Sequence, residues 1–225
     1  MTFPPEFWQA IWLTIRLAFV STLILLVIGL PIAQWLARGK GRAPVLLEVF
    51  LTLPIVLPPT VIGFYLLVLF APQTPIGALW THIMGQPLAF SFAGLVAGSV
   101  IYSLPFAIQP FRAGLSGVSQ ELIDVARISG ASRLGTFWHV TLPLARSGIA
   151  AGMVLSFAHT LGEFGVVLML GGSIPGKTKV VSIMLYDEVQ KMNYSVAHGF
   201  SAVLLVVAFL LILAVTLLQR QQAAE

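Results

Sequence analysis

The chain has 225 residues, of which 58% are hydrophobic and only 9% are charged. Soluble domains carry about 25% charged residues, so this composition excludes an ordinary soluble globular protein and indicates a polytopic membrane protein. No cysteine is present, which excludes disulfides, thiolate chemistry and cysteine-based metal sites. The formal net charge of +4 reflects membrane topology, and we expect no nucleic-acid partner.

Five apolar segments are long enough to cross about 30 Å of hydrocarbon, which takes about 20 helical residues. Four of them contain a charge-free run, at 17–36, 49–71, 88–111 and 196–218, and the fifth, 147–170, is interrupted only by His159 and Glu163. We therefore predict an all-α membrane protein with a single domain over residues 1–225. The predicted spans are 10–37, 47–71, 88–111, 147–170 and 196–218, and 112–146 is a long cytoplasmic loop.

Lys and Arg fall unequally on the two sides of this topology. Because basic loop residues resist translocation, the richer side is predicted to be cytoplasmic, with the N-terminus outside and the C-terminus inside. Met1–Ile11 lacks basic residues and precedes an apolar run too long for a cleaved signal, so we expect an uncleaved first helix. The richer side receives Arg38, Lys40, Arg42, Arg112, Arg127, Arg133, Arg146 and Arg220, and the other receives Lys177, Lys179 and Lys191.

The second span contains Pro54, Pro58 and Pro59. Proline removes backbone hydrogen bonds, so this helix is predicted to bend or unwind. A break of this kind is tolerated in lipid only where protein or a water-lined path satisfies the freed carbonyls. Two interpretations stay open: the segment lines a pathway, with Thr60 and Tyr65 as hydroxyl donors, or the prolines only shape helix packing.

The cytoplasmic segment 112–146 is longer than a simple connection needs. Ser119 is a plausible N-cap for a helix over 120–129, which Gly130 would end. A second short helix over 131–139 would present Phe137 and Trp138 as exposed aromatics. We interpret the pair as a plug for a partner's groove.

This segment resembles the cytoplasmic EAA loop of ABC importer permeases. In that family the loop sits in a cleft of the ATP-binding subunit and transmits its closure to the membrane helices. Asp replaces the usual Glu and Val replaces the usual second residue, Ala. The alternative is an amphipathic loop on the bilayer surface. The matching positions are Asp124, Val125, Ala126, Gly130, Val140, Leu142 and Pro143.

The segment 156–165, centred on Glu163, resembles one shared by permeases for molybdate, tungstate and sulfate. A charged residue inside the membrane costs about 2.5 to 3.5 kcal/mol, so Glu163 needs a partner or a polar cavity. We predict that it accepts hydrogen bonds from backbone or Arg groups and fixes a bend between Gly162 and Gly165. A proton relay with His159 is the alternative, and Arg16 either points outward or pairs with Glu163.

The segments 170–178 and 182–187 most resemble molybdate permeases. Gly171, Gly176, Lys177 and Thr178 also match the phosphate-binding pattern G-x-x-x-x-G-K-[ST]. We interpret this match as coincidental, because the segment follows a membrane helix instead of a strand. Lys177 and Lys179 are expected to attract anions near the outer mouth or to contact a partner.

Together these resemblances imply the permease subunit of a molybdate ABC importer in the cell inner membrane, with the type I importer fold. They imply a homodimer, two cytosolic ATPase subunits and a periplasmic molybdate-binding protein, with no catalytic residue, cofactor or metal in this chain. The pathway candidates are Pro58, Pro59, Thr60, Tyr65 and Glu163. A sulfate or tungstate permease is the close alternative. A stand-alone secondary transporter or an intramembrane hydrolase built on His159 is more distant.

Overall fold

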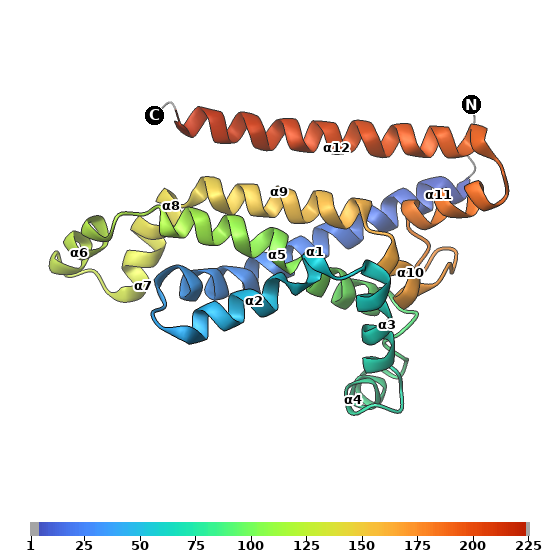
Figure 1. Cartoon of the computed structure of the whole chain (residues 1–225), viewed down its shortest axis with the longest axis horizontal. Helices are drawn as coiled ribbons and strands as arrows, with labels where there is room; N and C mark the ends of the chain where they lie inside the picture. The colour runs from blue at the N-terminus through green and yellow to red at the C-terminus, as the bar shows by residue number, and fades with distance from the viewer. Residues whose placement is uncertain (1–4, 224–225) are drawn as a thin grey trace.

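The computed structural model describes residues 5–223, and within that range it consists of helices and turns without a β-strand. The longest helices run along one axis of the molecule (Figure 1). Three of them are long and apolar enough to cross a membrane: α1 (Pro5–Arg38), α5 (Phe92–Ser116) and α12 (Tyr194–Ala223). They correspond to the first, third and fifth predicted spans.

Two bent helix pairs supply the other possible spans, and the second of them, 133–162, starts inside the predicted loop 112–146 instead of at residue 147. α2 (Arg42–Val56) and α3 (Pro59–Leu69) meet at an angle of 112°, and the helical segment 133–144 meets α9 (Arg146–Gly162) at 72°. The first bend lies where prolines remove backbone donors, and Pro59 opens α3. Counting each bent pair as one span gives up to five spans, the number predicted from the sequence.

Short helices fill the connections. The segment 72–87 contains α4 (Pro75–Met84), whose N-cap Thr74 accepts a hydrogen bond from the Gly77 amide. α10 (Gly165–Gly171) continues the chain after α9, and α11 (Val181–Gln190) follows it. The segment 112–146 holds α6 (Gln120–Ile128), α7 (Arg133–Thr136), the π-helical turn η1 (Phe137–Thr141) and α8 (Leu142–Leu144).

The core lies where α1, α5 and α9 pack side by side (Figure 1). Leu17, Leu95 and Phe111 are completely buried there. A Cβ added at Gly148 would lie 2.6 Å from the Gly114 Cα, so α5 and α9 touch backbone to backbone. This contact explains the small residues that the sequence places in both helices.

The two ends of the described chain lie at opposite ends of the long axis. α1 begins at the end that carries α11, whereas α12 finishes at the end that carries α6 (Figure 1). An odd number of crossings produces this arrangement. The segment 112–146 therefore shares its end of the molecule with the C-terminal end of α12 (Figure 1).

Candidate functional sites

The first half of the segment 112–146 folds as predicted. The Ser119 hydroxyl accepts a hydrogen bond from the Glu121 amide at 3.2 Å and starts α6. Gly130 has φ +91°, a conformation that residues with a side chain rarely adopt. The Ala131 amide donates to the Ala126 carbonyl at 3.0 Å, which closes the helix end. The sequence thus predicted this helix and its stop to within one residue.

The second half differs from the single helix expected over 131–139. α7 is capped by Ser132, whose hydroxyl accepts from the Gly135 amide, and the chain then widens into η1. The Leu142 amide bonds to the Phe137 carbonyl, five residues back. Pro143 has no N–H to continue an α-helical ladder, and it opens α8. Because the π-helical turn is wider, the chain stays helical through Pro143 although this proline donates no backbone hydrogen bond.

The predicted coupling residues fall into two groups. Asp124, Trp138 and Pro143 are exposed, with Trp138 at 55%. Ala126, Phe137 and Leu142 are half-buried, and the last two pack against the core. The expectation that Phe137 is an exposed aromatic was therefore wrong: it anchors the loop, and Trp138 alone of the pair projects outward.

Two arginines that the sequence assigned only to topology tie this segment to the bundle. Arg38 at the end of α1 donates through Nη2 to the carbonyls of Leu115 and Val118, at 3.1 and 3.0 Å. Arg112 on α5 forms an ion pair with Glu48 on α2. The sequence could have indicated these contacts by position, because Arg38 and Arg112 directly follow predicted spans and Glu48 lies at the start of one.

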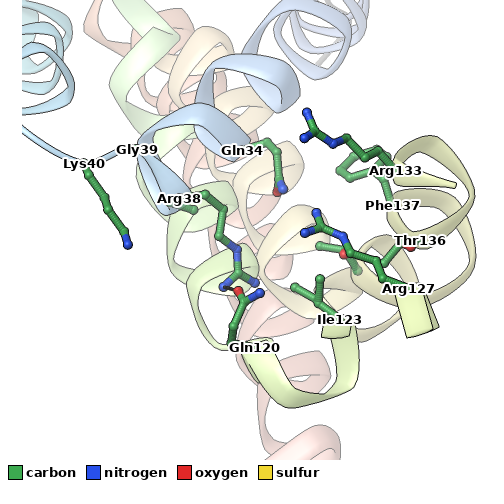
Figure 2. Close-up of a pocket in the computed structure, with 12 residues that line it drawn as sticks. Gln34, Arg38, Gly39, Lys40, Gln120, Ile123, Arg127, Arg133, Thr136 and Phe137 are labelled. Atoms are coloured by element: carbon green, nitrogen blue, oxygen red, sulfur yellow. Dashed lines mark hydrogen bonds between the residues drawn. The ribbon is translucent and has the colours of Figure 1, made fainter. Parts of the chain in front are cut away.

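A cleft of about 640 Å³ lies between the end of α1 and the short helices. Figure 2 shows Arg127 and Arg133 extending from α6 and α7 toward Gln34 on α1. Lys40 lies at the edge of the same cleft (Figure 2). The arrangement concentrates positive charge beside the predicted coupling residues.

The pathway candidates lie at a second place, where the two helix breaks meet. A Cβ added at Gly165 would lie 2.7 Å from the Pro59 Cβ, so the start of α10 rests directly on the start of α3. Pro58, Thr60 and Tyr65 are exposed in the single chain, with Tyr65 at 67%. Their role as pathway residues stays a prediction.

Glu163 occupies the break between α9 and α10. Its backbone is extended, with φ −66° and ψ 132°, and its carbonyl accepts a hydrogen bond from the Ser182 hydroxyl at 2.6 Å. The predicted bend between Gly162 and Gly165 is therefore present. The side chain is 4% exposed, and neither carboxylate oxygen has a hydrogen-bond partner among the described residues. In this conformation the predicted bonds from backbone or Arg groups are absent.

Neither Ser99 nor Arg16 forms a hydrogen bond or an ion pair with the Glu163 carboxylate. The Ser99 hydroxyl lies beside the carboxylate without meeting the geometry of a hydrogen bond. Arg16 does not pair with Glu163, because its guanidinium stacks 4.5 Å from the Phe92 ring centre. The carboxylate is therefore held in place by burial and by the helix break.

A serine and histidine pair lies one turn away. Ser103 Oγ is 2.9 Å from His159 Nδ1 and 3.0 Å from Thr160 Oγ1, and His159 stacks on Phe106. Ser103 is completely buried and lines none of the described cavities. A substrate does not reach this hydroxyl here, so the pair joins α5 to α9 and gives the hydrolase alternative no support.

The segment after α10 does not have the context of a phosphate-binding loop. Thr178 is completely buried, and its hydroxyl donates to the Gly171 carbonyl at 2.6 Å, so it closes the turn. Lys179 pairs with Asp187 at 2.5 Å, which offsets its charge. A hydrogen bond from Lys191 lowers the pKa of Glu188. Lys177 remains exposed and is the better candidate for attracting anions.

Comparison with curated proteins finds close relatives among oxyanion permeases. The chain is 46% identical to the molybdenum transport system permease protein ModB of Azotobacter vinelandii, over 91% of both chains. It is 37% identical to ModB of Escherichia coli K12, over 83% of this chain and 81% of that protein. Identity to the sulfate transport system permease protein CysT of the same strain is 31%, over 96% and 77%.

Solved structures show the same fold at low identity. A bacterial ABC transporter for the import of alginate matches 97% of this chain and 80% of its own, with a TM-score of 0.76 and 18% identity. The MetNI methionine ABC transporter matches 96% and 95%, with a TM-score of 0.70. The fold is thus that of type I ABC importer permeases. The model of the binding-protein-dependent transport system inner membrane component family matches residues 26–224, and the chain belongs to that family.

Proposed function

We propose that the chain is the membrane permease subunit of an ATP-driven molybdate importer. Its similarity to molybdenum permeases over nine-tenths of its length carries the substrate assignment. The loop from Asp124 to Pro143, with its helix, glycine turn and exposed Trp138, supports the coupling assignment. The chain supplies a path and a mechanical link, and partner subunits hydrolyse ATP.

The proposed assembly is a homodimer with two cytosolic ATPase subunits and a periplasmic molybdate-binding protein. The end that carries α6 faces the cytoplasm, because most Lys and Arg residues of the connections gather there. The N-terminus is then outside and the C-terminus inside. The translocation path follows the subunit interface past Pro58, Pro59, Thr60 and Tyr65.

In the proposed mechanism, the Asp124–Pro143 loop transmits the movement of the ATPase subunits to the membrane helices. Closure of the ATPase subunits moves the two loops together, and the contacts of Arg38 with Leu115 and Val118 make the ends of α1 and α5 follow. The helix break at Glu163 packs on the break at Pro59 through Gly165, so a shift of α9 reaches α3. This motion opens the outer side, and ATP hydrolysis restores the inward-facing state.

The substrate assignment is tested by competition. Uptake of radiolabelled molybdate by cells expressing the complete transporter should be blocked by excess unlabelled molybdate and hardly by equal sulfate. The 31% identity to a sulfate permease makes sulfate the second candidate. Equal competition by sulfate would reassign the cargo. Tungstate is expected to compete because it matches molybdate in size as well as in shape and charge, whereas sulfate is a smaller tetrahedral dianion.

A further inference from the structure

The basic cleft beside the loop adjoins an apolar groove. The groove has a volume of about 910 Å³ and lies between α1, η1 and α9. Gln34 and Phe137 line both spaces, so the cleft and the groove lie side by side. Apolar side chains dominate the groove wall, among them Leu26, Leu30, Trp35, Trp138, Leu142 and Met153.

The cleft has the features of an anion site. Arg127 and Arg133 point toward Gln34 (Figure 2), and neither forms an ion pair with a described residue. The acidic residues of α6, Glu121 and Asp124, do not line the cleft. The Gln34 Oε1 atom is buried without a hydrogen-bond partner in the described part of the chain. Buried polar atoms are nearly always paired, so this acceptor marks a place for a hydrogen-bond donor of a ligand, such as a hydroxyl of a lipid headgroup.

The groove has the depth of a lipid chain. From Leu26 to Gln34 the α1 helix rises about 12 Å, close to the roughly 15 Å of hydrocarbon in one leaflet. Trp35 and Trp138 stand at its mouth, 47% and 55% exposed. Tryptophan favours the boundary between hydrocarbon and headgroups, so the mouth marks the membrane surface.

We propose that the cleft and groove together bind one anionic glycerophospholipid. Its phosphate accepts hydrogen bonds from Arg127 and Arg133, a headgroup hydroxyl donates to Gln34 Oε1, and an acyl chain fills the groove beside Met153. A free anion would use only the cleft, and a second copy of the chain would use only the groove. A phospholipid uses both, and it holds the loop against the bilayer. The proposal needs a membrane-spanning chain but not a particular cargo, so it stands if the transported ion is different.

The test measures lipid binding to the full-length chain, purified with its partner subunits, by native mass spectrometry. The probes are phosphatidylglycerol and phosphatidylcholine with identical acyl chains. We expect phosphatidylglycerol to bind about tenfold more tightly, since each basic residue near a headgroup adds a favourable charge interaction. The double variant Arg127→Ala/Arg133→Ala should lose this preference. The double variant Arg42→Ala/Lys177→Ala, which removes equal charge outside the cleft, should keep it.

A second variant tests the groove independently of charge. Ala150 lines the groove, and Ala150→Phe should weaken binding of both lipids several-fold while leaving the preference for the anionic headgroup. Melting temperatures confirm that each variant is folded. Equal binding of the two lipids by the unchanged chain would overturn the proposal, as would displacement of phosphatidylglycerol by millimolar inorganic phosphate. A disulfide between two copies carrying Ala150→Cys, in a chain without native cysteine, would assign the groove to a second copy and also overturn it.

Discussion

Among single residues, Glu163 combines a buried carboxyl group with a position at a helix break. Its carboxylate is buried at a helix break and accepts no hydrogen bond from the described residues. An unpaired buried polar group costs about 1–3 kcal/mol, and more when it is charged. We therefore expect the Glu163 carboxylate to accept a hydrogen bond in another conformation of the transport cycle. That hydrogen bond would stabilise the other conformation.

Replacement of Glu163 by Gln tests this role. The amide keeps the shape and loses the charge, so the melting temperature should stay equal or rise while the uptake rate falls. The pH profile of the remaining uptake should run parallel to that of the original protein. A Glu188→Gln variant, changed at the outer ion pair, serves as the control. Uptake that keeps its rate but loses its pH dependence would support the proton relay with His159 instead.

Gly130 is the second residue with a sharp expectation. Its positive φ places any side chain in a strained conformation, and a left-handed backbone costs roughly 1–2 kcal/mol. Gly130→Asp should therefore displace α7 relative to α6 and abolish transport-coupled ATP hydrolysis, while the chain still inserts into the membrane. Gly41→Asp is a matched control, because Gly41 also has a positive φ, 95°, and open space around it. Normal substrate-stimulated hydrolysis by the Gly130 variant would contradict the coupling role.

At the scale of elements, the contact between the two helix breaks joins the halves of the chain. Prolines predicted the first break and the Gly162–Gly165 segment predicted the second, because both are local backbone effects. Their contact was not predicted, since it depends on how segments about 100 residues apart pack. The same limit explains why Glu163 and Arg16 have other neighbours than expected, and why Phe137 is half-buried.

Local chemistry likewise decided which parts of the cytoplasmic loop were predictable. α6 was, because Ser119 caps it and Gly130 ends it. The turn η1 was not, because it combines the missing N–H of Pro143 with the packing of Phe137 against the core. The coupling and pathway roles of these residues remain predictions from resemblance.

Gly165→Ala tests the contact between the breaks. The added methyl group would lie 2.7 Å from Pro59 and 3.3 Å from the Thr60 amide nitrogen, so the elements must shift. Overpacking of this kind costs about 1–3 kcal/mol, and thermal unfolding of the purified protein should show it as a lower melting temperature. Gly162→Ala is the control, since a methyl group there meets nothing within 4 Å. Equal melting temperatures for the two variants would show that the two helix breaks do not pack tightly against one another.

The ion pair between Glu48 and Arg112 gives a smaller, measurable effect. Both side chains are more than one-third exposed, at 35% and 38%, and exposed pairs contribute about 0.2–1 kcal/mol. Glu48→Gln and Arg112→Gln should each destabilise the protein slightly, and the double variant should cost less than the sum. A double-mutant cycle by thermal or denaturant unfolding measures this coupling energy. Strict additivity would show that the pair does not link α2 to α5.

At the scale of the whole molecule, the long helices connect two ends with different chemistry. One end carries α6 to α8 and most of the basic connection residues, and the other carries α10, α11 and the Lys179–Asp187 pair (Figure 1). The packed core of α1, α5 and α9 spans the distance between them. Close packing transmits displacement instead of absorbing it, which is what a permease driven from one side requires.

We propose that ATP hydrolysis by partner subunits drives molybdate through this chain by way of the Asp124–Pro143 loop. The most direct measurement is uptake of radiolabelled molybdate into proteoliposomes that contain the chain, its ATPase and its binding protein. We predict uptake that requires ATP and every partner and that disappears with Gly130→Asp while all subunits remain assembled. Uptake by the purified chain alone, under an ion gradient and without ATP, would contradict the ATP-driven mechanism and identify a secondary transporter.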